Sequence, residues 1–236
     1  MPRTPDAVTL SAAHVDAVNR HRCVVQNFDV LLVDPSQYDT VEDIVKHRFM
    51  FIDDPTTHTD SIWWNWCEGN VVPYPSKFLP RYNEPGYQKW FDESVDIVRI
   101  IQDETRKHGL EVFYSHRMNG GDNDPQFQEG RGSFIDDTAN LYQVPTKREH
   151  PDWLIQVPSN PNGLWNFAVE GVRDYVLRNL TEIIEDYDFD GLELDFARST
   201  PVLPPGRAWE HRDDLTALIR DLRSVALEVE RKRGRP

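Results

Sequence analysis

Segments typical of buried strands alternate along this chain with amphipathic helical segments, and no other feature constrains the fold as strongly. The strand-like segments are dense in Val, Ile, Leu and aromatic residues and cover residues 22–33, 61–67, 110–115 and 189–196. The helical segments repeat apolar residues at a period near 3.6 and cover residues 11–19, 41–46, 86–108, 166–187 and 213–232. Strands that alternate with helices predict right-handed βαβ units around a parallel sheet.

The pattern predicts a single α/β domain over residues 1–236, a length that is enough for one full core. Two architectures fit four visible strands: a doubly wound sheet, or the first four βα units of a (β/α)8 barrel. Both place their functional sites in the loops that follow the carboxyl ends of the strands. We therefore look for polar residues at those ends.

The charge balance narrows the class of partner. The formal net charge is −14, from 40 acidic and 26 basic residues, so phosphate backbones and anionic membrane surfaces are repelled. A neutral ligand such as a sugar, or a cationic one, fits better. The first ten residues lack the apolar core of a signal peptide, and no run approaches the roughly 18 apolar residues of a membrane span. We expect the chain to be soluble as it stands, with a periplasmic or secreted location left open if a leader was removed.

Metal and cofactor motifs are not evident in the sequence. Cys23 and Cys67 each lie in an apolar run, where two buried thiols are favoured over one disulfide between neighbouring strands. The histidines do not have the spacing of metal ligands, and phosphate-binding glycine loops and the GxSxG elbow are missing. The sequence therefore predicts no metal and no cofactor.

The last strand-like segment carries two carboxylates. Side chains alternate along a strand, so Glu193 and Asp195 share one face. The opposite face is apolar and carries Leu192, Leu194 and Phe196. Burying two carboxylates is costly unless they are paired, which leaves an ion pair with Arg117 as one reading and a ligand site as the other. Two like charges on one face favour keeping a proton on one of them, as acid/base chemistry requires.

The other strand-like segments also end in polar residues, some of them beside indole rings. Aromatic faces stack on a pyranose ring, while carboxylates, amides and guanidinium groups bind its hydroxyls. We therefore predict a carbohydrate site in which Asp195 and Glu193 are catalytic. The predicted substrate-binding residues are Arg117, Asn119, Asp122, Asn27, Asp29, Asn65 and Trp64. His116 is predicted to face the helices as a core residue.

Two segments resemble a known group of proteins. Glu111-Val-Phe-Tyr-Ser-His-Arg-Met-Asn119 and Tyr187-Asp-Phe-Asp-Gly-Leu-Glu-Leu-Asp-Phe-Ala-Arg198 are similar to bacterial glycoside-hydrolase-like TIM barrel proteins, which are family 10-like and of planctomycete type. The resemblance implies a TIM-barrel-type α/β fold, represented by its first four βα units after a short N-terminal helix. It also implies hydrolysis of a poly- or oligosaccharide, with Asp195 as nucleophile or acid/base and Glu193 as its modulator.

The chain departs from that group in one motif, and from chitinase-like barrels in another. Gly120-Gly121-Asp122 stands where an Asp often follows the Asn directly, and Ala197 stands where chitinase-like barrels have a Glu. Substrate-assisted chitinase chemistry is therefore not expected.

Other functions stay open at this point. Glycosidases need two carboxylates, and the second one could lie on strands five to eight of a complete barrel. A half barrel could instead be a non-catalytic carbohydrate-binding protein that forms a homodimer through its exposed barrel edges. It could also be a fragment of a longer gene product with no activity of its own.

Overall fold

The computed structural model describes residues 11–20, 24–29, 38, 40–54, 56, 58–67, 70–81, 85–119, 144–158 and 160–234. Its elements in chain order are α1 (Ala12–Arg20), β1 (Val24–Asp29), α2 (Val41–Phe49), β2 (Ser61–Cys67), α3 (Pro85–Asp92), α4 (Ile97–Lys107), β3 (Glu111–Arg117), α5 (Pro145–Glu149), a 3-10 turn (Pro151–Trp153), β4 (Leu154–Val157), β5 (Asn160–Trp165), α6 (Glu170–Asp186), β6 (Gly191–Asp195) and α7 (Arg212–Arg233).

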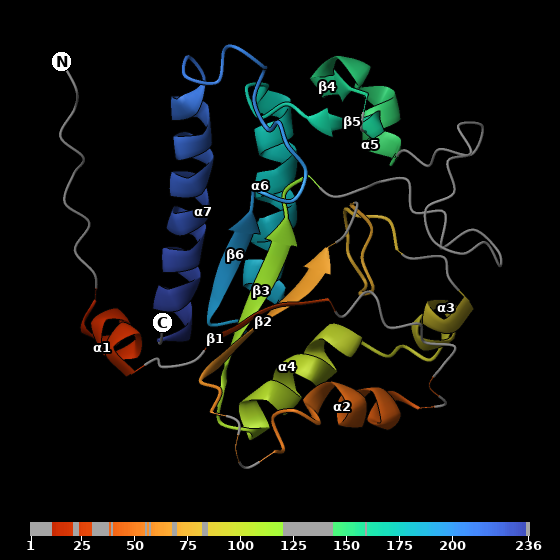
Figure 1. Ribbon diagram of the computed structural model, residues 1–236, viewed down its shortest axis with the longest axis vertical. Coiled ribbons are helices and arrows are strands. Elements are labelled where there is room, and N and C mark those ends of the chain that lie inside the picture. Colours follow the sequence, from red (N-terminus) through yellow and green to blue (C-terminus); the bar gives the residue numbers. More distant parts are fainter. Residues whose placement is uncertain are drawn as a thin grey trace.

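Four strands form the central sheet in the order β1-β2-β3-β6, and every neighbouring pair is parallel. The antiparallel hairpin of β4 and β5 lies beyond the arrowhead ends of β3 and β6 (Figure 1). The predicted α/β fold with a parallel sheet is confirmed. Among the described residues the sheet does not close into a barrel, since β1 and β6 each pair on one side only.

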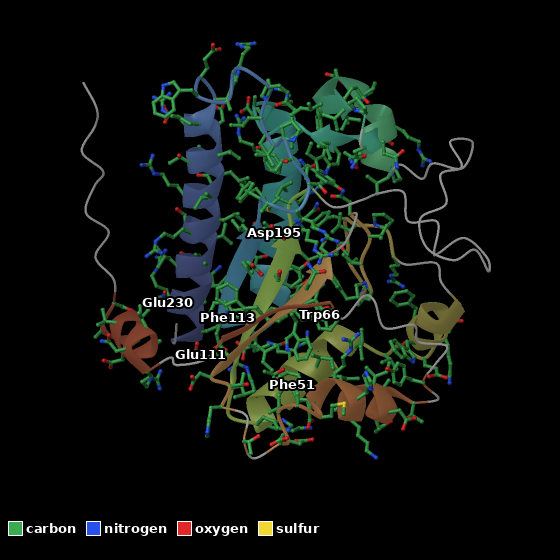
Figure 2. The ribbon with its side chains drawn as sticks, viewed as in Figure 1. Phe51, Trp66, Glu111, Phe113, Asp195 and Glu230 are labelled. Atoms are coloured by element: carbon green, nitrogen blue, oxygen red, sulfur yellow. The ribbon has the colours of Figure 1, made fainter. Side chains whose placement is uncertain are left out.

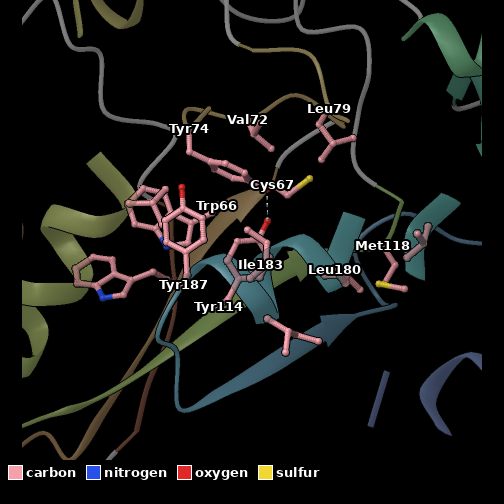
Figure 3. Close-up of a cluster of buried hydrophobic side chains, with 14 of the residues drawn as sticks. Trp66, Cys67, Val72, Tyr74, Leu79, Tyr114, Met118, Leu180, Ile183 and Tyr187 are labelled. Atoms are coloured by element: carbon pink, nitrogen blue, oxygen red, sulfur yellow. Dashed lines mark hydrogen bonds between the residues drawn. The ribbon is translucent and has the colours of Figure 1, made fainter. Parts of the chain in front are cut away.

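Aromatic and aliphatic side chains on one face of the sheet pack against the helices. Trp64 and Tyr114 are fully buried on this face, and the indole Nε1 of Trp64 donates to the hydroxyl of Thr105 in α4 at 3.0 Å. The hydroxyls of Tyr114 and Tyr74 lie 3.3 Å apart, and Ile183 of α6 is in the same cluster (Figure 3). Because apolar burial fills this face, polar side chains of the strands are directed to the other.

The helix predicted over residues 86–108 is two helices, so that prediction was wrong. Ser94 has φ 58°, a left-handed conformation that interrupts the helical ladder between α3 and α4. Asp96 then caps α4, since its Oδ1 accepts the N–H of Arg99 at 3.1 Å. The apolar period continues through Trp90 and Val98, both buried, which is why the pattern did not reveal the break.

Between the strand predicted over residues 110–115 and the helix predicted from residue 166, no element was predicted, yet the structure is regular from Pro145 onward. The helix α5 and the β4–β5 hairpin fill this region, and Gly163 has φ 76° within the hairpin. The short strands lack a clear alternating pattern, which explains why the sequence did not predict them. The helices predicted over residues 41–46 and 213–232 are observed, the first extending to Phe49. A capping box of Thr40 and Asp43 begins α2, and Gly234 ends α7 in a left-handed conformation.

Candidate functional site

A row of polar residues crosses the sheet at one register. Asp29 pairs with Asn65, Asn65 with Ser115, and Ser115 with Glu193 on successive parallel strands. Register partners in parallel strands direct their side chains to the same face, so we call Asn65, Ser115 and Glu193 the polar row. The backbone register extends this row to Asp29. Asp29, Asn65 and Glu193 were predicted separately from three strands. The register places them in one row with Ser115.

Two residues further along the strands, Arg117 pairs with Asp195. This pair lies at the carboxyl end of the sheet, where Figure 2 labels Asp195 near the arrowheads of β3 and β6. Arg117 is 2% exposed, whereas Asp195 is half-buried. A buried guanidinium next to an accessible carboxylate is suited to hold an anionic or hydroxyl group in a fixed orientation.

Two stacked aromatic rings lie on the amino-terminal side of the polar row, opposite the Arg117–Asp195 pair. We call Trp63 and Phe113 the aromatic floor. The rings of Trp63 and Phe113 stack at 4.9 Å between centroids with 22° between their planes. Phe113 in turn pairs in register with Gly191, where a Cβ atom would lie 2.3 Å from Cε1 of the phenyl ring. A glycine at position 191 is therefore needed to leave room for the ring of Phe113. The side chains of Trp63 and Phe113 are both partly accessible.

The carboxylate of Asp195 is held by the turn that follows its strand. Its Oδ1 accepts the backbone N–H groups of Ala197 at 2.9 Å and of Arg198 at 3.1 Å. The carbonyl of Asp195 accepts the N–H of Met118 at 3.0 Å, which joins the ends of β6 and β3. Asp195 thus has a fixed position. Glu193, two residues earlier on the same face, has a Cα about 6.6 Å away at the usual strand rise.

Asn65 and Ser115 are buried without hydrogen-bond partners. Asn65 is 0% exposed, and neither its amide nitrogen nor its amide oxygen is hydrogen-bonded. Ser115 is 1% exposed, and its hydroxyl has no partner either. Native interiors satisfy most buried polar groups, so this pair is unusual.

Asn119 makes contacts that support the fold. Its Oδ1 accepts the N–H of Trp165 at 2.7 Å, and its Nδ2 donates to the carbonyl of Trp165 at 3.4 Å. These two bonds attach the end of β5 to the end of β3. Both amide atoms of Asn119 are bonded to main-chain groups, so they are not open to a ligand.

Trp64 does not lie in the site, which corrects its prediction as a sugar-binding residue. It is 0% exposed on the helix face, bonded to Thr105 and packed 5.6 Å from the ring of Phe49. A fully buried indole has no free face on which a sugar could stack. The neighbouring Trp63 lies on the site face instead, and the sequence alone did not distinguish the two.

Three predicted residues are less completely described. Asp122 lies outside the described residues. Asn27 falls between Val25 and Phe28, where the register with β2 shifts, so no partner strand residue is assigned to it. Asp29 is placed by register alone. Of the two cysteines, Cys67 is buried and forms no disulfide with a described residue, and Cys23 lies outside the described residues.

His116 lies on the helix face beside Tyr114, as predicted. The two rings stack at 6.0 Å, and the imidazole is 3% exposed. Burial lowers the pKa of His116 to about 4, so the ring is neutral at pH 7. It belongs to the packing of the sheet rather than to the polar row.

Within the described part of the chain, His, Cys, Asp and Glu side chains nowhere gather in threes that could bind a metal ion. None of the described helices has the length and apolarity needed to cross a bilayer.

Comparisons with known proteins give distant likenesses. No family model matches the chain. It is 27% identical over 138 residues to a 1,4-α-glucan branching enzyme of Salinibacter ruber, which covers 52% of this chain and 20% of that enzyme. It superposes on the galactosidase domain of an α-galactosidase-sucrose kinase with a TM-score of 0.50 and 13% identity, covering 88% of this chain and 26% of the other.

A family 36 α-galactosidase of Geobacillus stearothermophilus gives a TM-score of 0.49 with 15% identity, covering 88% of this chain and 27% of that one. The chain therefore spans about a quarter of these structures and a fifth of the branching enzyme. At such identities the likeness establishes the fold alone. The fold of this chain is glycoside-hydrolase-like.

Sequence reasoning missed three residues of the site. Ser115, Trp63 and Phe113 belong to the face that carries Asn65 and Glu193, yet none was predicted to have a role. Strand alternation already placed Ser115 and Phe113 on the face of Arg117. The missing information was the register between strands.

Proposed function

We propose that this chain is part of a glycoside-hydrolase-like protein that acts on a poly- or oligosaccharide at the carboxyl ends of β2, β3 and β6. The single observation that carries the proposal is the polar row, with the Arg117–Asp195 pair on one side and the aromatic floor on the other. Aromatic rings match the C–H face of a pyranose, and the amide, hydroxyl and carboxylates match its hydroxyls. The glycoside-hydrolase-like fold supports this reading.

Asp195 is the proposed nucleophile or acid/base. Its backbone contacts fix one carboxylate oxygen, which is the positioning that a reacting group needs. Arg117 is proposed to hold a substrate hydroxyl or to orient Asp195, and Asp29, Asn27 and Asp122 remain proposed substrate-binding residues.

Glu193 is the proposed modulator and a candidate for the second carboxylate. Glycosidases use two carboxyl groups, about 5–5.5 Å apart when they retain configuration and 6.5–9.5 Å apart when they invert it. Glu193 and Asp195 share one face of β6, which keeps both carboxylates on the proposed substrate side of the sheet. A carboxylate from a part of the barrel beyond these strands is the other source.

The architecture is proposed to be the first four βα units of a (β/α)8 barrel. Four parallel strands with helices packed on one face, and polar side chains on the other, correspond to half of such a barrel. The resemblance to family 10-like proteins of planctomycete type supports this from the sequence motifs.

A second candidate function is a non-catalytic carbohydrate-binding half barrel that assembles with a second copy. The observation that favours it is that β1 and β6, among the described residues, each have one unpaired edge. A twofold axis along the barrel would place β6 of one copy beside β1 of the other in parallel. Static light scattering distinguishes a dimer, which supports this candidate, from a monomer, which contradicts it.

Turnover and binding of sugars in the same preparation test the two functions. The chain is incubated with a panel of p-nitrophenyl α- and β-glycosides and with polysaccharides, and released product and bound ligand are both measured. Hydrolysis supports the enzyme, and binding without hydrolysis supports the second candidate. If the chain neither binds nor hydrolyses any of these sugars, both candidate functions are contradicted.

A further inference from the structure

We infer that Asn65 and Ser115 form a hydroxyl-binding subsite, which takes one hydroxyl of a neutral sugar. The inference rests on the proposed function for the class of ligand. It adds a specific position to the site and includes a residue, Ser115, to which the sequence assigned no role.

The two side chains are neighbours because β2 and β3 pair in the sheet. Asn65 in β2 and Ser115 in β3 are register partners, on strands about 4.8 Å apart. Trp64 and Tyr114, the residues before them, pack on the helix face, so both polar side chains are directed to the opposite face. Glu193 follows in the same register on β6 and closes the third side.

The absence of partners distinguishes this pair from Ser61 and Thr105, which are buried to the same extent. The hydroxyl of Ser61, also fully buried in β2, accepts the indole N–H of Trp63 at 2.9 Å. The hydroxyl of Thr105 donates to the carbonyl of Ile101 at 2.7 Å. The fold thus satisfies polar groups at comparable depth, and leaving the Asn65 amide and the Ser115 hydroxyl unbonded is costly unless a ligand or water completes them.

Other unbonded polar atoms are of two kinds. Gln102 of α4 has both amide atoms unbonded, and Nδ1 of His116 is unbonded as well, but both residues lie on the helix side of the sheet. On the site face, Oε2 of Glu193 and Nε of Arg117 are also unbonded, although each of these residues has other partners. Within the described residues, Asn65 and Ser115 are the register partners on the site face whose side-chain polar atoms are all unbonded.

The chemistry of the pair selects a neutral hydroxyl. The amide of Asn65 offers donors and an acceptor, and the hydroxyl of Ser115 offers both. A sugar hydroxyl both donates and accepts, so it can satisfy several of these atoms at once. A phosphate or carboxylate offers acceptors alone, so it would leave the amide oxygen of Asn65 unbonded.

The test distinguishes a role of these two side chains in ligand binding from a role in stabilising the fold. In Ser115→Ala and Asn65→Leu, the unbonded polar groups are removed while the side chains stay close in size. We expect the melting temperature of the ligand-free variants to equal or exceed that of the wild type, because no hydrogen bond is lost. Thr105→Val is the matched control, because it removes a buried, bonded hydroxyl on the helix face and should lower the melting temperature by a few degrees or so.

Binding is measured by calorimetry with methyl α-D-galactopyranoside, methyl α-D-glucopyranoside and any glycoside that the hydrolysis panel identifies. We expect affinity to fall roughly tenfold or more in Ser115→Ala and Asn65→Leu, and to change little in Thr105→Val. The subsite alone is overturned if Ser115→Ala is as destabilised as Thr105→Val, or if Ser115→Ala binds sugar as tightly as the wild type. A wild-type protein that binds none of the sugars overturns the subsite and the proposed function together.

Discussion

Arg117 and Asp195 are register partners at the carboxyl ends of β3 and β6, and the N–H of Met118 donates to the carbonyl of Asp195 at 3.0 Å. This main-chain bond keeps the two strand ends together beyond the last ladder pair. It places a buried cation beside a half-buried carboxylate at the edge of the sheet where α/β proteins carry their sites. The predictions below test the parts of the site that surround this pair.

Replacing Gly191 with Ala should destabilise the sheet. The added Cβ would meet the ring of Phe113 at 2.3 Å, so the ring and its partner Trp63 must move. Such overpacking costs about 1–3 kcal/mol in the free energy of unfolding, which urea denaturation measures. Adding Phe113→Leu should recover part of the loss, and a double variant no more stable than Gly191→Ala would argue against this contact.

The two adjacent tryptophans should respond oppositely. Trp63→Leu removes part of the aromatic floor, so we expect weaker sugar binding and a modest change in stability. Trp64→Leu removes a buried indole and its bond to Thr105, so we expect a loss of about 3 kcal/mol or more in stability with sugar affinity of the folded protein unchanged. Calorimetry and urea denaturation on both variants give the comparison, and equal loss of affinity in both would contradict the face assignment.

Asn119→Leu should loosen the β4–β5 hairpin. The substitution leaves the N–H and carbonyl of Trp165 without their partners, which costs about 1–3 kcal/mol in stability. Hydrogen exchange at the Trp165 amide should accelerate more than exchange in β3. Asn166→Ala is the control, because it removes one local bond to the N–H of Ala168 and should have a smaller effect. Unchanged exchange at Trp165 in Asn119→Leu would show that the hairpin is held by other contacts.

The buried imidazole of His116 should make stability fall in acid. Its pKa is lowered to about 4 by burial, whereas an unfolded histidine has a pKa near 6.5. Between these values the unfolded state binds the proton first. Stability is therefore greatest above pH 6.5 and is lost as the pH falls toward 4, by up to about 3 kcal/mol from this group. His116→Phe should lose less stability than the wild type between pH 6.5 and pH 4 in urea denaturation, and an identical pH dependence would contradict the burial of a neutral ring.

His108 provides the control of opposite sign. The carbonyl of Glu104 and then the carboxylate of Asp53 raise the pKa of His108 above 6.5, because they accept its ring N–H groups at 2.9 and 3.0 Å. Its contribution is present below pH 6.5 and is lost as the pH rises through the raised pKa. His108→Gln should therefore lose more stability relative to the wild type at pH 5.5 than at pH 8.

The sequence predicted those parts of the fold that depend on local pattern. The strand over residues 61–67 is observed with the same ends, and Glu193 and Asp195 share one face because side chains alternate along any strand. The left-handed turn at Ser94 was not predicted, since the apolar helical period continues across it.

The site itself depends on information that the sequence pattern does not carry. Asn65, Ser115 and Glu193 become neighbours through strand register, which long-range packing decides. Likewise, Trp63 and Trp64 are identical in type, and only the pleat of β2 determines which of them packs against α4.

The central claim is that Asp195 is the reacting carboxylate of a carbohydrate site, and hydrolysis by Asp195→Asn tests it most directly. Asparagine keeps the Oδ1 acceptor for the N–H groups of Ala197 and Arg198, so the turn and the melting temperature should be preserved. Asp213→Asn, at a side chain that is 84% exposed, controls for the loss of one charge. With a substrate found in the glycoside panel, the account predicts that Asp195→Asn loses hydrolysis by roughly a thousandfold or more while Asp213→Asn retains it. Wild-type rates in a folded Asp195→Asn protein would contradict the account.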